Sequence, residues 1–88
     1  MTISAMQLHP DDTVACLLRD HRAGAPAQLV SGATPVLTSD VALGHKIALV
    51  PIAKGEAVVK YGAVIGHATA DIAPGDHVHL HNLRGKIG

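Results

Sequence analysis

Short apolar stretches alternate with polar and turn-forming residues along the whole chain. None of them keeps the 3.6-residue spacing of an amphipathic helix over a dozen positions. Glycine or proline interrupts the sequence every few residues, which is typical of turns between short strands. The pattern therefore predicts an all-β fold. The expected strands, each bounded by Gly, Pro, Asp or Ser, are Ile3–Leu8, Thr13–Leu18, Ala27–Val30, Val36–Thr38, Lys46–Pro51, Ala57–Lys60, Ala63–Ala68 and His77–His81.

Two segments depart from this pattern. A short helical turn fits Ser39–Leu43, because Ser39 or Asp40 can cap free amides and Gly44 can end the turn in a left-handed conformation. The segment Arg22–Thr38, rich in Gly, Ala, Pro, Ser and Thr, has the least hydrophobic pattern and predicts a loop-rich, mobile excursion between strands.

A weak internal repeat of the form I-A-x-G-[ED]-x-V occurs at residues 52–58 and again at residues 72–78. In each copy the Ile and Val can anchor the two sides of a tight turn, and the Gly supplies the backbone freedom that the turn needs. The repeat predicts two similar turns, which could also have arisen independently.

The chain length predicts a single domain over residues 1–88 with a modest core. There is no Phe or Trp and one Tyr. The core must therefore come from Val, Ile, Leu and Ala, and burying one of the larger side chains contributes roughly 1.5–3 kcal/mol. So small a domain would gain stability from a partner or from a second copy of itself.

Charge and hydropathy exclude several partners. Seven basic side chains balance seven acidic ones without a Lys/Arg cluster or interleaved aromatics, so no nucleic-acid partner is expected. The N-terminal residues lack the features of a signal peptide, and the longest apolar stretch, Ile47–Ala53, is far too short to span a membrane. These features predict a soluble, cytoplasmic protein with no membrane partner.

The most informative stretch is GDHVHLHN at residues 75–82. In a strand, His77, His79 and His81 share one face, while Val78 and Leu80 take the other and can pack on the core. Residues two apart on one face are about 6.5–7 Å apart, so two such imidazoles can bind one cation with bonds of about 2.0–2.1 Å. The outer two begin roughly 13 Å apart, so one of the three should transfer protons or bind a carboxylate. The same strip could instead be a solvated or interface face.

The remaining histidines and the cysteine give weaker indications. His45 and His67 each follow a glycine and can either converge on the strip or lie on separate loops. His9 and His21 have no supporting context and are expected at the surface. Cys16 lies within an apolar run and is expected to be a small buried hydrophobic residue rather than a nucleophile.

Polar residues at two strand ends complete the candidates. Lys60 and Tyr61 precede Gly62, so an amine and a phenol can reach an anionic substrate or partner from a turn. They could equally be an exposed hairpin lysine beside an aromatic ring that fills the core. Asp76 and Asn82 bracket the histidine strip, where they can orient imidazole N–H groups or shape turns.

Three segments read in order resemble the SAF domain of the altronate/galactarate dehydratase family. They are LGHKIAL at residues 43–49, KYGAVIG at 60–66 and GDHVHLHN at 75–82, and the dense likeness covers roughly residues 40–83. The resemblance implies an SAF-like β-clip fold and a metal-dependent lyase that acts on sugar acids such as altronate or galactarate. It also implies a large catalytic dehydratase subunit as partner, because nothing in this chain matches the large domain of that family. The Met at position 1 and the stop at Gly88 suggest the separate small-subunit form.

The resemblance also implies roles for the candidate residues. His79 and His81 are expected to hold the metal, with iron(II) favoured over manganese or zinc. His77, His45 and Lys60 are expected to assist proton transfer, and Lys60, Tyr61 and Asn82 to bind substrate. Three alternatives stay open: a sulfolactate sulfo-lyase subunit, a non-catalytic module that binds metal or a partner, and a structural subunit whose histidines line an interface.

Overall fold

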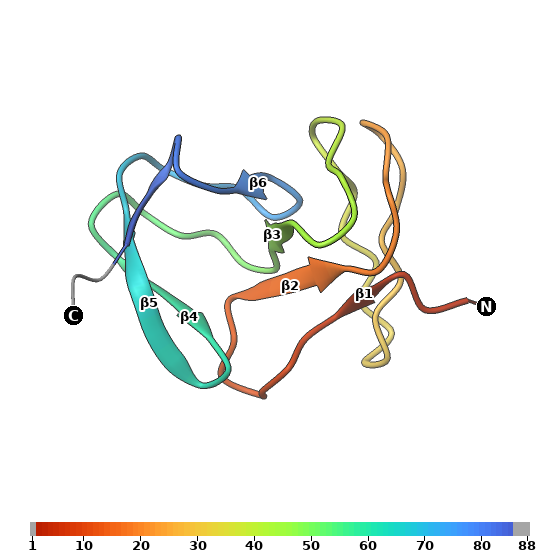
Figure 1. Ribbon diagram of the computed structural model, residues 1–88, viewed down its shortest axis with the longest axis horizontal. Helices are drawn as coiled ribbons and strands as arrows, with labels where there is room; N and C mark the ends of the chain where they lie inside the picture. Colours follow the sequence, from red (N-terminus) through yellow and green to blue (C-terminus); the bar gives the residue numbers. More distant parts are fainter. Residues whose placement is uncertain (1, 86–88) are drawn as a thin grey trace.

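The computed structural model describes residues 2–85 as two antiparallel sheets without a helix. The ends of the predicted 1–88 domain lie outside the described residues. The strands are β1 (Ala5–Met6), β2 (Val14–Leu17), β3 (Lys46–Ala48), β4 (Ala57–Lys60), β5 (Ala63–Ala68), β6 (His77–Val78) and β7 (Leu83–Gly85). The first sheet has the order β1-β2-β3-β6 and the second the order β4-β5-β7, and the two lie side by side (Figure 1). The predicted all-β fold is confirmed. No helix among these residues is long and apolar enough to cross a membrane.

The strand predictions succeed best in the second half of the chain. β4 and β5 have the predicted bounds, whereas the strands found within Ile3–Leu8, Thr13–Leu18, Lys46–Pro51 and His77–His81 are shorter than expected. β7 was not predicted, because its three residues are too few to show an alternation. It is held by pairing to β5, with Arg84 opposite His67.

The two strands predicted within Arg22–Thr38 were wrong, whereas the predicted loop-rich character of this segment is confirmed. Ala27–Val30 and Val36–Thr38 are not strands, although their backbones run together through Ala27 N–H to Pro35 O at 2.9 Å and one bridge between Pro26 and Val36. Pro26 and Pro35, which lie in the two paired segments, lack the N–H groups that a regular ladder needs. The excursion is nevertheless anchored rather than free, since it buries three apolar side chains in the core. These are Ala27, Leu29 and Leu37.

Four turns of the chain share one geometry. Each contains a glycine with φ between +84° and +89°: Gly24, Gly44, Gly55 and Gly75. In every case the residue after the glycine donates its N–H to the carbonyl three residues earlier. Bridges join the turns in pairs, His21 to Val41 and Ile52 to Ile72. The second pair confirms the twin turns predicted from the repeat, and the first pair escaped detection because His21 replaces an apolar anchor.

Carboxylates fasten the paired turns to each other. The Asp20 carboxylate accepts the Leu43 N–H at 2.7 Å, and the Asp40 carboxylate accepts the Ala23 N–H at 2.8 Å. In the other pair of turns, the Asp71 carboxylate accepts the Lys54 N–H at 2.9 Å. The helical turn predicted at Ser39–Leu43 is absent, because the Asp40 side chain caps the opposite turn instead of its own segment. Asp40, which the sequence suggested as a local helix cap, instead makes a contact with a residue 17 positions away.

The first sheet is buried on both faces, because alternate residues of its strands enter two hydrophobic clusters. The first cluster contains Ala5, Ala15, Leu17, Ala27, Leu29, Leu37, Val41 and Ile47. The second contains Val14, Ala48, Ile52, Val58, Ala68, Ile72, Val78 and Leu83. Both hydrophobic clusters thus contain residues of β2 and β3. β6 pairs with β3 at the edge of this buried sheet.

His21 is buried, with 5% of its surface exposed, so its predicted surface position was wrong. Its Nε2 lies 2.9 Å from the Ser4 Oγ and its Nδ1 lies 2.9 Å from the Arg19 carbonyl oxygen. A carbonyl only accepts, so Nδ1 carries the proton and the Ser4 hydroxyl donates to Nε2. The Ser4 Oγ in turn accepts the Gln28 N–H at 2.9 Å. Hydrogen bonding makes this polar residue compatible with the core.

Replacing Ser4 with alanine is expected to lower the free energy of unfolding by about 1–3 kcal/mol, because it leaves a buried imidazole nitrogen and a backbone N–H without partners. Urea unfolding measures the change. Ser31→Ala is the control, because that serine is exposed and should cost less than about 0.5 kcal/mol. Equal stability of the two variants would contradict the assigned hydrogen-bond chain.

Candidate metal centre

β6 occupies the edge of the four-stranded sheet, and within residues 2–85 it pairs with β3 alone. The register places Val78 opposite Lys46 and His77 opposite Ile47. Val78 is fully buried, so it holds the strand to the core while the neighbouring His77 side chain stays half-buried at the sheet edge. The same pairing brings the residue before β3, His45, beside the end of β6.

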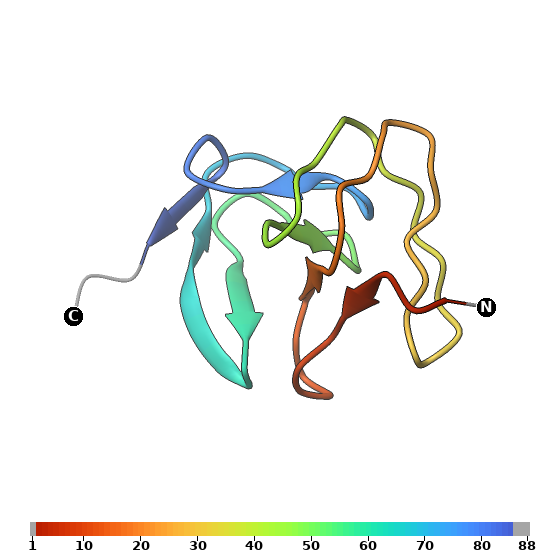
Figure 2. The same cartoon turned by 45° about the vertical axis from the view of Figure 1, so that its right-hand side comes forward.

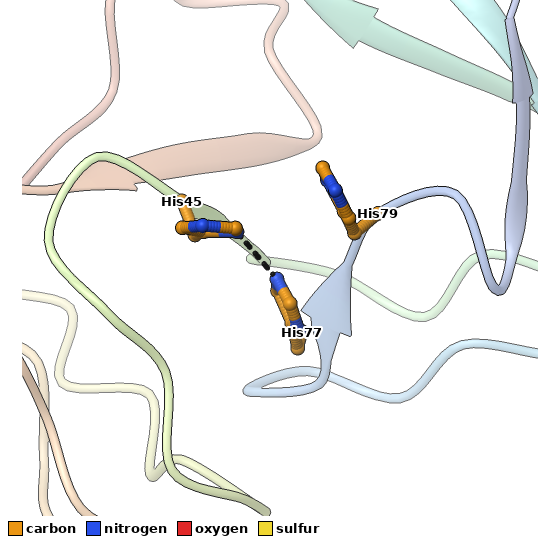
Figure 3. A group of neighbouring side chains, drawn as sticks. All are labelled: His45, His77 and His79. Carbon is orange, nitrogen blue, oxygen red and sulfur yellow. Dashed lines mark hydrogen bonds between the residues drawn. The ribbon is translucent and has the colours of Figure 1, made fainter.

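Three imidazoles converge at this edge. The His45 Nδ1 lies 2.9 Å from the His77 Nε2 in a hydrogen bond, and Figure 3 shows the His79 ring facing the pair from the end of β6. Each of these three side chains offers a ligand nitrogen, and the nitrogens all lie within 4.8 Å of one another. The His77 and His79 rings are stacked, with centroids 5.5 Å apart. Period-two alternation therefore correctly placed these two rings on one face.

The strand ends earlier than the alternation predicted. The Asn82 Oδ1 accepts the His79 N–H at 3.0 Å, and the Asn82 Nδ2 donates to the His77 carbonyl at 2.8 Å. This clamp turns the chain, so Leu80 is 79% exposed and its predicted packing on the core was wrong. Asn82 shapes the turn on which His77 and His79 are mounted.

The electrostatic environment favours neutral imidazoles. Burial lowers the pKa of His77 below its usual range, and the neighbouring His45, His81, His79 and Lys46 lower it further. The pKa of His79 is lowered by desolvation first and then by His45, Lys46 and His81. A neutral imidazole is the form that binds a metal ion, so both shifts extend the pH range in which ligands are available.

The three side chains fit a divalent metal ion. Bonds of about 2.0–2.1 Å at right angles place two ligand nitrogens roughly 2.9 Å apart, whereas tetrahedral ligands lie about 3.3–3.4 Å apart. The His45 and His77 nitrogens are 2.9 Å apart because they share a hydrogen bond, and this distance is short enough for both to reach one ion once the shared proton is released. No carboxylate joins this group among residues 2–85, so the site offers nitrogen ligands alone.

The other predicted site residues lie around or away from this group. His81 lies beyond the turn, with its ring centroid 5.3 Å from that of His77. His67 lies on β5, outside the imidazole group. Lys60 and Tyr61 form the tip of the β4–β5 hairpin, on the side of the molecule opposite β6 (Figures 1 and 2). The Lys60 ammonium lies 5.4 Å from the Tyr61 ring centroid, and this ring is 67% exposed instead of filling the core.

Lys46 is a charged neighbour that sequence reasoning missed. It pairs across the sheet with Cys16 on one side and Val78 on the other. Burial lowers the pKa of Lys46, Lys60 lowers it further, and Cys16 acts in the opposite direction. The available signal was its position directly after His45, but the pattern treated it only as the start of a strand. Cys16 is half-buried, less covered than predicted.

The lowered histidine pKa values predict how the stability of the metal-free chain depends on pH. Between these lowered values and the usual value of about 6.5, the unfolded chain binds more protons than the folded chain. The free energy of unfolding should therefore fall as the pH drops below about 6.5. Urea unfolding between pH 7.5 and 5.5 measures this fall. The His77→Ala/His79→Ala double variant should show a smaller fall, and an unchanged pH dependence would contradict the assignment.

Comparisons with known proteins identify the family to which the sequence is similar. The sequence pattern of the altronate/galactarate dehydratase SAF domain matches residues 3–86. The chain is 51% identical over 82 residues to an altronate dehydratase of Escherichia coli, covering 93% of this chain and 16% of that protein. It is 40% identical over 84 residues to an altronate dehydratase of Bacillus subtilis, covering 96% and 17%. It is also 42% identical over 48 residues to a (2R)-sulfolactate sulfo-lyase subunit alpha of Paracoccus pantotrophus, covering 54% and 72%.

Proposed function

The chain belongs to the altronate/galactarate dehydratase SAF domain family, and from this premise we propose that it is the small, metal-holding part of a lyase that dehydrates a sugar acid. The observation that carries the proposal is the convergence of His45, His77 and His79 on one point at the edge of the first sheet. The chain spans about one sixth of the altronate dehydratases that it matches. We therefore propose a large catalytic dehydratase subunit as its partner.

The proposed reaction removes water from a 2,3-dihydroxy acid. The C2–H and C3–O bonds break, the C2 proton goes to a base, and the leaving hydroxyl takes a proton to depart as water. The resulting enol becomes the 2-keto-3-deoxy acid. A divalent metal ion, when bound, would stabilise the negative charge that develops on the substrate carboxylate.

The proposed roles of the site residues follow from their positions. His45, His77 and His79 would hold the metal, and the family resemblance favours iron(II), with manganese and zinc as the alternatives. His81, beside His77 but outside the group, would move a proton or bind the substrate. The Lys46 ammonium would attract the substrate carboxylate toward the imidazoles.

The hairpin tip is better placed for the large subunit than for the substrate. The tip of the β4–β5 hairpin, which carries Lys60 and Tyr61, points away from β6 (Figure 1), although the Lys60 ammonium is near enough to Lys46 to lower the pKa of that residue. Tyr61 has a φ of 57°, which is uncommon for a residue other than glycine. An exposed phenol beside an ammonium, held on a tight turn, suits contact with an anionic surface.

A sulfo-lyase function is the second candidate, because the matched sulfolactate sulfo-lyase is itself described as an alpha subunit. The likeness covers 54% of this chain, whereas the altronate dehydratases cover 93% and 96%. The altronate dehydratases match nearly the whole chain, so the dehydratase function is favoured over the sulfo-lyase function.

The test is reconstitution with a candidate large dehydratase subunit from the same genome, in the presence of iron(II). Formation of a 2-keto-3-deoxy acid is measured over a panel of sugar acids, and sulfite release is measured with sulfolactate. Product from a sugar acid only when both chains are present is the expected result. Activity of the large subunit alone, or sulfite as the only product, would overturn the proposal.

A further inference from the structure

A polar hollow of about 350 Å³ adjoins the imidazole group and shares His77 with it. Its walls come from segments far apart in the sequence, including Thr38 and Ser39 at the end of the excursion, Asp71, and His81 on the turn after β6. The volume lies at the lower end of the range of about 300–1,000 Å³ that holds small ligands. The hollow is therefore large enough for part of a substrate.

The walls offer hydrogen-bond groups that the fold does not use. The Ser39 hydroxyl and the His81 ring make no hydrogen bond within residues 2–85. Asp71 accepts the Lys54 N–H through Oδ1 alone, which leaves its Oδ2 available. Such acceptors and donors match the hydroxyl groups of a polyhydroxy chain.

The charges around the hollow favour one orientation of an acidic, hydroxylated ligand. Asp71 and Asp76 lie in the wall of the hollow, whereas Lys46 lies on the side of the imidazoles. A carboxylate is repelled by the acidic wall and attracted to the cationic side. Hydroxyl groups bind favourably at the acidic wall, because they can donate hydrogen bonds to its carboxylates. An acid with a hydroxylated tail would therefore enter in one orientation.

The position of the excursion is fixed at this hollow. The Thr38 hydroxyl donates to the Asp76 Oδ1 at 2.6 Å, and the Thr38 N–H donates to the Gly75 carbonyl at 3.3 Å. The otherwise patternless segment Arg22–Thr38 thus ends at the wall beside His77. Its end can shape the hollow without contributing to the imidazole group.

We infer that this hollow binds the hydroxylated tail of the substrate. The inference rests on the proposed dehydratase function. Asp71 and Ser39 are assigned as residues that bind the tail, while His45, His77 and His79 face the carboxylate end.

The test uses the enzyme assembled with its large subunit and compares KM for altronate with the inhibition constant of glycerate, which has the same head but no tail. Asp71→Ala and Ser39→Ala should each raise KM for altronate about tenfold, as expected for a lost hydrogen bond to a charged or polar partner. Glycerate inhibition should change less than twofold. Asp40→Ala is the matched control, because Asp40 fastens the other pair of turns in the way that Asp71 fastens this one.

Each outcome separates the inference from the proposed function. A chain-length-dependent loss in the two variants, absent from Asp40→Ala, supports the tail site. An equal effect on both acids, or no effect on either, overturns the tail site while wild-type turnover of altronate preserves the proposed function. Failure of the wild-type assembly to bind or turn over any sugar acid overturns both.

Discussion

Replacing His79 with alanine should weaken divalent-metal binding at least about 100-fold, because loss of even an outer-shell partner of a ligand typically costs about 10–100-fold. His79 offers one of the three converging nitrogens. Its backbone N–H, which bonds to Asn82, is retained in the variant, so the turn itself should persist. Competition with a chromophoric chelator measures the affinity, and urea unfolding of the metal-free protein reports any loss of fold.

His67→Ala is the matched control for this substitution. His67 is an exposed histidine on β5 and lies outside the imidazole group. Its removal should leave metal affinity within a factor of two. If His67→Ala and His79→Ala weaken binding equally, or if neither does, the metal is not held by the imidazoles at the edge of the first sheet.

Replacing Gly75 with alanine should destabilise the domain by roughly 4 kcal/mol or more, an effect at the upper end for single substitutions. An added Cβ would lie 1.9 Å from the Val36 carbonyl oxygen, so the backbone of the excursion or of the turn must move. The φ of +89° adds strain for any residue with a side chain. Because β6 begins two residues later, the substitution should also displace His77.

Gly55→Ala isolates the clash from the backbone strain. Gly55 has the same φ of +89° on the equivalent turn, but an added Cβ there meets nothing within 4 Å. This variant should cost only about 1–2 kcal/mol. Urea unfolding of both variants gives the comparison. Equal losses would show that the excursion does not press against the Gly75 turn.

The sequence allowed part of the imidazole group to be predicted. Alternation along one strand is a local property, and it correctly placed His77 and His79 on the same face. It did not indicate His45, because that residue joins the group only through the pairing of β3 with β6, which are separated by some thirty residues in sequence. Contacts of this kind depend on topology and leave no periodic signal.

Side-chain hydrogen bonds limited the other predictions. The Asn82 clamp ends β6 before the alternation does, which exposes Leu80. The Asp40 carboxylate caps a distant turn instead of a local helix. In both cases a polar residue that is common in turns had several possible partners, and the fold selected one of them. The family resemblance was confirmed because it rests on the order and spacing of three motifs together.

The excursion shows why composition alone misleads. Its Gly, Ala, Pro, Ser and Thr content indicated a mobile loop, yet Leu29 and Leu37 are buried in the first hydrophobic cluster. Isolated apolar residues beside prolines show no alternation, so their burial is decided by the surrounding strands. The same segment ends at the hollow beside His77, where Thr38 contacts Asp76.

The most direct test of the central claim is an anomalous-scattering map of crystals of the protein loaded with iron(II) or manganese. A single strong peak within bonding distance of nitrogens from His45, His77 and His79 is the predicted result. A metal peak bound elsewhere, for instance at His9 or His67, or loaded crystals with no peak at the edge of the first sheet, would contradict it.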